Sequence, residues 1–338
     1  MTSLQILHRH SLKPVKRVGM SPYIAPGVFR NGHVNSIVSV SPARKLLLNR
    51  QCRDFRRAAT PVIIPAQHNI RLSALINRQP GKAYTVLLMH GWLGCADSLY
   101  LISLGQALFQ AGYHVVRLNF RDHGNSHHLN AQLFHSCRIQ EVINACVYIQ
   151  DQFQSDLSLI GFSLGGNFAL RVNAYTQRSE LDLHRTIAIC PVIDPDNTLT
   201  ALENSMPVYA HYFMQRWKKT FYAKAQTFPT LYAKASFDEA HDLRTATANL
   251  ATQYAGFSDL DSYLQGYSIC GQRLSTLQAE AITLLAKDDP IIPWQDKDKM
   301  YPADNHQILT SQHGGHCGFL NHTLNSTWIN RLIVEHLQ

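Results

Sequence analysis

The sequence of 338 residues predicts an α/β fold: a mostly parallel eight-stranded sheet with helices on both faces and a helical cap insertion. Three observations predict it. Short runs rich in Val, Ile and Leu alternate with helical stretches, several of these runs are apolar at every position, and one long segment interrupts the alternation. Runs without polar alternation are typical of strands buried on both faces of a parallel sheet.

Eight such runs can be assigned as strands. The helices expected between or after them cover residues 99–111, 137–153, 165–177 and 323–337. Strands that alternate with helices in this way form βαβ units, which make the sheet parallel. The expected strands are Pro61–Pro65, Ile70–Ile76, Thr85–His90, His114–Asn119, Leu157–Gly161, Thr186–Cys190, Ala281–Ala286 and Gln307–Ser311.

The segment between two late strands, residues 196–273, has no strand pattern and is rich in aromatic residues. We expect it to form a helical cap inserted into an α/β core made of residues 58–195 and 274–338. Its aromatic side chains would either line a pocket or form the packing core of the cap itself.

The first 57 residues are strongly basic. They hold eleven Lys and Arg and one acid, Asp54, so that they carry +10 while the rest of the chain carries −2. Such a segment can be a solvated surface element, or it can attract nucleic acid or an anionic membrane. No helix-turn-helix, RRM or zinc-finger pattern accompanies it, so nucleic acid is not expected as a partner. Membrane-surface contact through this arm stays an open expectation.

The seven cysteines suggest a reducing environment. Their number is odd and no pair is spaced as CxxC, which argues against a disulfide framework and a zinc ribbon. No stretch reaches the roughly 20 apolar residues of a membrane span. The apolar stretch near the N-terminus is too short for a signal peptide. We therefore expect a soluble, cytoplasmic protein.

A G-x-S-x-G pattern at Gly161, Ser163 and Gly165 follows one expected strand and opens an expected helix. This is the context of a nucleophile elbow, a strained strand-to-helix turn that exposes a serine hydroxyl at the carboxyl end of the sheet. Bulky neighbours would clash in so sharp a turn. A serine hydroxyl is a weak nucleophile on its own, so Ser163 needs a base and an acid elsewhere in the chain.

Two neighbouring acids compete for the acid role, Asp288 and Asp289, in the sequence LLAKDDPIIP. Both directly follow an expected strand, so either carboxylate would emerge at the sheet edge that carries the serine. We favour Asp289 because a D-x-x-[VI]-P pattern fits it and does not fit Asp288. The alternative is that Asp288 is the acid, or that it only caps a proline-braced turn.

The base is expected in the loop SQHGGHCGF, after the last strand, which follows the order serine, acid, histidine. His316 is favoured because the small residues around it would let its imidazole approach the serine, and His313 is the rival. A metal site made of His313, His316, Cys317 and His322 is not expected, because no second ligand cluster supports it.

An oxyanion hole is expected where MHGWLG follows the third strand. The backbone N–H of Trp92 would join that of Leu164, just after the serine. Two such preset donors would stabilise the negative charge that develops on an attacked carbonyl oxygen.

Six motifs in order give the chain a family resemblance. They are FRNGHVNSI at 29–37, HG-x-x-G at 90–94, F-R-x-H-G-x-S at 120–126, G-x-S-L-G-G-N at 161–167, A-K-D-D-P at 286–290 and H-G-G-H-x-G-F at 313–319. With them the chain resembles the α/β-hydrolases, and more narrowly the YheT-like esterase/hydrolase branch, over roughly residues 25–335. The resemblance implies a triad of Ser163, Asp289 and His316 and an esterase-like activity, but it does not carry over a substrate.

These residues predict a serine hydrolase of the carboxylesterase or lipase type. It would cleave a small acyl ester or lipid-like ester through an acyl-enzyme, with no cofactor and no metal. The alternatives are an acyltransferase or thioesterase on the same triad, or a ligand-binding protein on a hydrolase fold without catalysis. The sequence predicts no oligomeric state.

Overall fold

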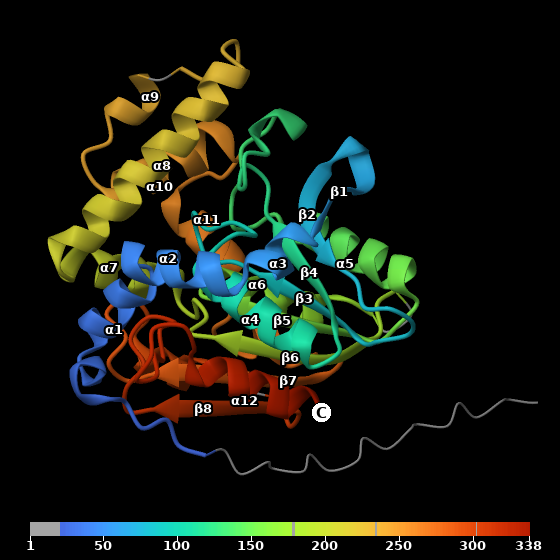
Figure 1. Ribbon diagram of the computed structural model, residues 1–338. Coiled ribbons are helices and arrows are strands. Elements are labelled where there is room, and N and C mark those ends of the chain that lie inside the picture. Colours follow the sequence, from blue (N-terminus) through green and yellow to red (C-terminus); the bar gives the residue numbers. More distant parts are fainter. Residues whose placement is uncertain (1–20, 178–179, 234, 302) are drawn as a thin grey trace, which may run out of the picture.

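The computed structural model describes residues 21–177, 180–233, 235–301 and 303–338. Its centre is a single eight-stranded sheet in the order β1-β2-β4-β3-β5-β6-β7-β8 (Figure 1). All eight predicted strands are present, with ends shifted by no more than a few residues. The strands are β1 Thr60–Pro65, β2 Arg71–Asn77, β3 Thr85–Met89, β4 His114–Asn119, β5 Leu157–Phe162, β6 Leu183–Ile189, β7 Glu280–Ala286 and β8 His306–Ser311.

The sheet is mostly parallel, as predicted. β1 pairs with β2 and β2 with β4 in antiparallel register, whereas every pairing from β4 to β8 is parallel. The carboxyl ends of the parallel strands therefore meet at one edge of the sheet. Open α/β sheets bind their ligands at this edge.

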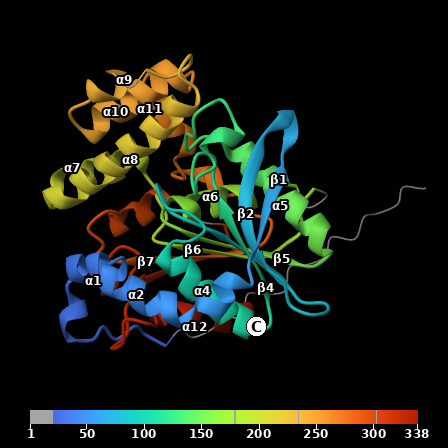
Figure 2. The ribbon, with the colours of Figure 1, turned by 45° about the horizontal axis from the view of Figure 1, so that its top comes forward.

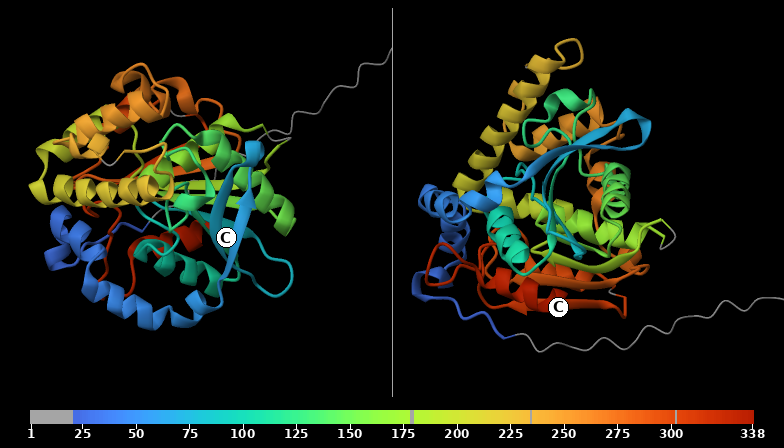
Figure 3. Two further views of the ribbon diagram at one scale, coloured as in Figure 1. Left: turned by 90° about the horizontal axis from the view of Figure 1, so that it is seen from above. Right: turned by 45° about the vertical axis from the view of Figure 1, so that its right-hand side comes forward.

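Helices cover both faces of the sheet (Figures 1 and 3). β3 illustrates the two layers. Val86 and Leu88 belong to the apolar cluster that includes α4, whereas Leu87 and Met89 belong to the cluster that includes α5. The helices are α1 Gly32–Ser39, α2 Pro42–Gln51, α3 Arg53–Arg57, α4 Leu99–Gln110, α5 Ile139–Phe153, α6 Leu164–Tyr175, α7 Pro195–Asn204, α8 Pro207–Thr227, α9 Ala235–Asp238, α10 Leu243–Asn249, α11 Leu260–Tyr267 and α12 Trp328–Leu337.

The last helix begins later than the sequence predicts. α12 begins at Trp328, five residues after the predicted start at 323. The residues before it form bends and turns, and Thr327 forms an antiparallel bridge with Leu320 in an extended conformation. The predicted first residues of the helix, 323–327, are therefore part of a loop.

The basic N-terminal segment is largely helical where the structure describes it. Residues 32–57 form α1, α2 and α3, which lie beside α4 and the loops at the carboxyl edge of the sheet (Figure 2). Residues 1–20, which hold the first four basic residues, lie outside the described part. No helix in the described ranges is both long and apolar enough to cross a bilayer.

The segment between β6 and β7 rises as helices α7 to α11 above the carboxyl edge of the sheet (Figure 1). Part of its aromatic content forms a core of its own: the ring of Phe221 lies 5.4 Å from that of Phe237 and 6.1 Å from that of Tyr232. Phe213 instead stacks on Trp92 of the loop after β3 at 5.3 Å. The two interpretations of these aromatic residues therefore both apply, to different side chains.

A buried ion pair fastens α8 to the loop after β4. Lys224 Nζ donates to Asp122 Oδ1 at 2.7 Å and to the carbonyl of Asn130 at 2.5 Å, and the side chains of Lys224 and Asp122 are 0% and 1% exposed. Burial lowers the pKa of Lys224 and raises that of Asp122, and each partner's charge opposes the shift of the other. The pair therefore depends on both of its members.

Removing one partner of this pair should be costly. We expect Lys224→Ala to lower the free energy of unfolding by about 3–5 kcal/mol, because it leaves the charge of Asp122 buried and unpaired. The double variant Asp122→Asn/Lys224→Met should recover most of the loss, since asparagine tolerates the positive φ of 60° at this position. Urea unfolding at pH 7 measures both. A loss below about 0.5 kcal/mol in the single variant would contradict the anchoring role.

Candidate functional site

The turn between β5 and α6 holds Ser163 in a strained backbone conformation. Its φ is 55° and its ψ is −121°, and its N–H donates to the carbonyl of Ile189 at 2.8 Å. A positive φ is uncommon outside glycine and costs energy that the surrounding structure must offset. The strand-to-helix turn that the sequence predicts is therefore present, with Ser163 at its apex.

Two glycines make this turn sterically feasible. A Cβ on Gly161 would lie 2.0 Å from the carbonyl oxygen of Gly165, and one on Gly165 would lie 2.4 Å from the carbonyl oxygen of Met89. Real Cβ atoms do not approach backbone so closely, so only glycine fits at either position. The G-x-S-x-G spacing is thus explained by close backbone contacts on both sides of Ser163.

The structure brings His316 and Asp289 together. Nδ1 of His316 lies 2.9 Å from Oδ2 of Asp289, whose side chain is 1% exposed. The other carboxylate oxygen, Oδ1, accepts the N–H groups of Ile291 at 2.8 Å and Ile292 at 3.0 Å. These bonds fix the carboxylate, so it orients the imidazole.

Asp288 and His313, the rival residues, form a separate pair. Oδ1 of Asp288 accepts the N–H of Gly315 at 2.9 Å, and its Oδ2 lies 3.5 Å from Nδ1 of His313. Asp288 therefore holds the backbone of the histidine loop, while its neighbour contacts the imidazole of His316.

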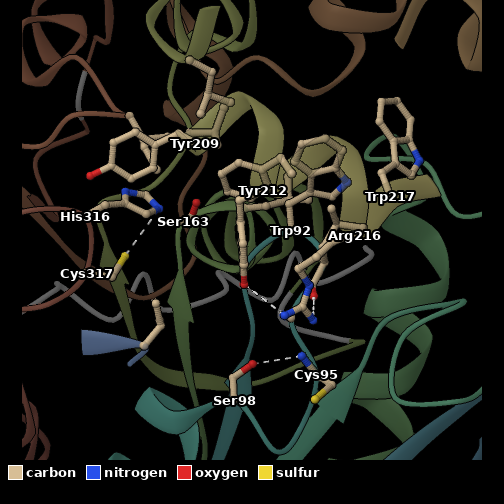
Figure 4. A pocket seen from close by; sticks show the side chains of 18 of the residues that line it. Trp92, Cys95, Ser98, Ser163, Tyr209, Tyr212, Arg216, Trp217, His316 and Cys317 are labelled. Atoms are coloured by element: carbon tan, nitrogen blue, oxygen red, sulfur yellow. Dashed lines mark hydrogen bonds between the residues drawn. The ribbon is translucent and has the colours of Figure 1, made fainter. Parts of the chain in front are cut away.

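Ser163 and His316 border one cavity. Figure 4 shows the hydroxyl of Ser163 on the side of the His316 ring that carries Nε2. Within the described ranges, Oγ of Ser163 makes no hydrogen bond, and the hydrogen-bond partner of Nε2 of His316 is Sγ of Cys317 at 4.0 Å. Nucleophile–base bonds are often loose in the absence of substrate. The structure thus brings all three predicted residues to one place, with the serine–histidine bond unformed.

The charges around His316 shift two pKa values. Burial alone would lower the pKa of His316, but the carboxylate of Asp289 raises it well above its ordinary value. Burial likewise would raise the pKa of Cys317, but a hydrogen bond with Cys190 and the charge on His316 lower it to about 6. His316 is therefore easily protonated, as a base beside an anion should be.

Both segments that carry the predicted oxyanion donors run close to Ser163. Leu164 is the first residue of α6, so its N–H has no carbonyl partner inside the helix. The loop that contains Trp92 passes close by: a Cβ on Gly91 would be 3.2 Å from Cβ of Ser163. The N–H of Gly91 itself is taken by the hydroxyl of Tyr100 at 2.9 Å, which fixes this loop.

The N-terminal helix α1 supports the site, which the sequence analysis did not foresee. The N–H of His316 donates to Oγ of Ser36 at 2.7 Å. A Cβ on Gly32 would lie 1.8 Å from the carbonyl oxygen of Asp288, so α1 packs directly on the acid loop. The FRNGHVNSI motif was the available signal, because its small residues allow this close approach.

A cavity of about 820 Å³ lies above the serine, within the range of small-molecule sites. Its wall comes from the core loops, from α1 and α2, and from the helices between β6 and β7. Figure 4 shows Tyr209, Tyr212, Arg216 and Trp217 around it. Arg216 donates to the hydroxyl of Tyr212 at 3.0 Å and to the carbonyl of Leu93 at 2.8 Å. The cavity is therefore mainly apolar, with a guanidinium at one side.

The site offers no obvious metal centre. Among the described residues, no group of three or more His, Cys, Asp or Glu side chains could hold a metal ion. All seven cysteines are free. The cysteine and histidine side chains of the loop after β8 contact each other and the backbone instead.

Comparisons with known proteins agree with this architecture. Residues 86–324 match the model of the "Alpha/beta hydrolase family". The chain is 23% identical over 245 residues to the Escherichia coli (strain K12) protein named "Putative esterase YheT", covering 71% of each chain. It is 24% identical to human "Monoacylglycerol lipase ABHD2" over 203 residues, which is 54% of this chain and about half, 48%, of that protein.

A solved structure shares the fold. The esterase Pf2001 of Pyrococcus furiosus superposes with a TM-score of 0.55 at 15% identity, over 82% of this chain and 91% of that chain. Identity this low speaks for the fold alone. The family match, in contrast, spans the strand-to-helix turn, the acid loop and the histidine loop. The chain therefore belongs to the alpha/beta hydrolase family.

Proposed function

We propose that this protein is a serine esterase that hydrolyses a hydrophobic acyl ester, with Ser163 as nucleophile, His316 as base and Asp289 as acid. The observation that carries the proposal is the buried Asp289–His316 pair beside a serine held at positive φ on the wall of an apolar cavity. Such a grouping costs free energy through backbone strain and through the desolvation of charged groups. A protein that only binds a ligand has no need of it. The names of the relatives, an esterase and a monoacylglycerol lipase, support the same reaction class.

The proposed reaction begins with attack by Oγ of Ser163 on the ester carbonyl. Nε2 of His316 takes the hydroxyl proton, while Nδ1 keeps its own proton in the hydrogen bond to Asp289. The carboxylate fixes this tautomer and stabilises the imidazolium that forms. The carbonyl oxygen becomes an oxyanion, which the N–H groups of Trp92 and Leu164 would stabilise.

The intermediate then collapses to an acyl-enzyme. His316 returns its proton to the leaving alcohol as the ester C–O bond breaks. Water repeats the sequence: His316 takes a proton from the water, which attacks the acyl carbonyl, and then protonates Oγ as the acid departs. An acceptor other than water would make the same triad an acyltransferase, so water access to the acyl-enzyme decides the reaction.

A serine-reactive fluorophosphonate tests the nucleophile. It should label the wild-type protein and not Ser163→Ala, and the variant should lose at least ~10³-fold in kcat on a chromogenic ester with its fold intact. The matched control is Ser98→Ala, which removes another hydroxyl from the same cavity and should still be labelled. Equal labelling of Ser163→Ala and wild type would refute the triad.

Replacement of the two aspartates should have clearly different effects on activity. Asp289→Asn should lower kcat by about 10⁴-fold through loss of the correct imidazole tautomer, and Asp288→Asn should cost far less. His316 must be neutral to accept a proton, so activity should rise with pH through its raised pKa. Asp289→Asn removes the anion that raises this pKa and leaves the burial that lowers it, which shifts the midpoint of kcat/KM to lower pH. If Asp288→Asn lowers kcat more than Asp289→Asn does, Asp288 is the acid of the triad.

Aromatic side chains of the insertion should control chain length only where they line the cavity. Phe213 lines it, whereas Phe237 does not and is buried in the aromatic core of the insertion behind Trp217. Phe213→Ala should raise the ratio of kcat/KM for long over short acyl esters by about tenfold. Phe237→Ala should lower the melting temperature and leave the ratio unchanged. An unchanged ratio in Phe213→Ala would show that its ring only packs the insertion.

A further inference from the structure

The cavity opens between α1 and the start of α8, and its edge is apolar and exposed to solvent. The two helices touch where Nδ1 of His33 lies 3.1 Å from the hydroxyl of Tyr209. Beside this contact, Ile37 and Val40 of α1 are 44% and 52% exposed, and all the views show the two helices on the same side of the molecule (Figures 1, 2 and 3). Both residues also line the cavity, so the same side chains face the cavity and the solvent.

The exposed apolar surface continues on both sides of this opening. On α2, Leu46 and Leu47 are 73% and 45% exposed, while Leu48 is buried. On α8, Val208 and Tyr212 are 49% and 44% exposed. We call the following set the apolar rim: Ile37, Val40, Leu46, Leu47, Val208 and Tyr212. Since α1, α2 and α8 all border the same cavity, these exposed apolar side chains gather around one opening. Exposed apolar side chains gathered in this way mark an interaction site more often than scattered single residues do.

Basic side chains outnumber acidic ones on the helices that carry the rim. The sequences of α1, α2 and α8 contain no Asp or Glu. Lys45 and Arg50 of α2 and Arg57 of α3 are exposed beside the rim. Asp54 is the only acid among residues 21–57, against seven Lys and Arg, of which Arg44 is buried and Arg56 lies 3.6 Å from Asp97. The helices that form the opening therefore combine apolar and basic side chains without opposing charge.

We propose that the apolar rim docks on an anionic phospholipid surface, with the cavity opening turned toward the lipid. Apolar side chains would enter the boundary between headgroups and acyl chains, and Lys and Arg would contact the lipid phosphates. The basic side chains of these helices favour an anionic lipid surface over a second copy of the chain. A second copy of the chain would bring two equally basic surfaces together, which like charges oppose.

Docking in this orientation gives an ester of low water solubility a route from the bilayer into the cavity. That consequence rests on the proposed hydrolase function, whereas the docking itself does not. An apolar substrate would pass over Ile37 and Val208, which line the cavity, without crossing water.

Vesicle flotation of the full chain tests the proposal. Vesicles of equal parts phosphatidylcholine and phosphatidylglycerol should bind the protein at least tenfold better than vesicles of phosphatidylcholine alone, and added salt should weaken the binding. Leu46→Glu/Leu47→Glu should lower the partition coefficient at least tenfold. Neither residue lines the cavity, so hydrolysis of a soluble short ester should stay at the wild-type rate.

The matched control is Ile63→Glu/Tyr84→Glu. It makes the same change in net charge at two residues that are 48% and 58% exposed on β1 and before β3, away from the rim. The control should bind vesicles like the wild type. Equal loss in both variants, no binding by the wild type, or a dimer that Leu46→Glu/Leu47→Glu disperses would each overturn the proposal. Absent ester hydrolysis with rim-dependent vesicle binding would refute the proposed function alone.

Discussion

The backbone turn at Ser163 is the constraint on which the rest of the site depends. A residue at φ 55° and ψ −121° can reverse the chain from β5 into α6 only if the strand and the helix come within backbone contact. Gly161 and Gly165 allow that contact, and the second of them also packs on the end of β3. The turn therefore sets where the loop after β3 runs, and with it where Trp92 meets the cavity.

The acid and histidine loops are held from a distant part of the sequence. Gly32 lies against the backbone of Asp288, and Ser36 accepts the N–H of His316. Both contacts come from one short helix, α1. The basic N-terminal segment, whose charge suggested a solvated surface element, thus supports the proposed base and acid through α1. Most of its basic side chains remain at the surface, whereas Arg44 is buried and donates to the carbonyls of Ser39 and Leu324.

Local sequence patterns predicted the features of the fold that depend on residues close together in the chain. The eight strands and the turn at Ser163 follow from apolar runs and from glycines at fixed spacing, which act within a few residues. The contact of Ser36 with His316 joins residues 280 positions apart, and no local pattern encodes such a contact. The predicted start of α12 was wrong for a related reason, because Thr327 forms a bridge with Leu320. A local pattern favoured Asp289 over the adjacent Asp288, whereas the contact of Asp289 with His316 depends on the three-dimensional course of the two loops.

The helix α8 connects these parts, because it is fixed at two points with different chemistry. Near its C-terminal end, the buried pair of Lys224 with Asp122 joins it to the loop after β4. Near its N-terminal end, Tyr209 meets His33 of α1 through a partly exposed contact. A fully buried ion pair is costly to separate, whereas a single part-buried hydrogen bond contributes much less. Opening of the cavity should therefore occur between α1 and the start of α8, where the apolar rim lies, with Lys224 as the fixed end.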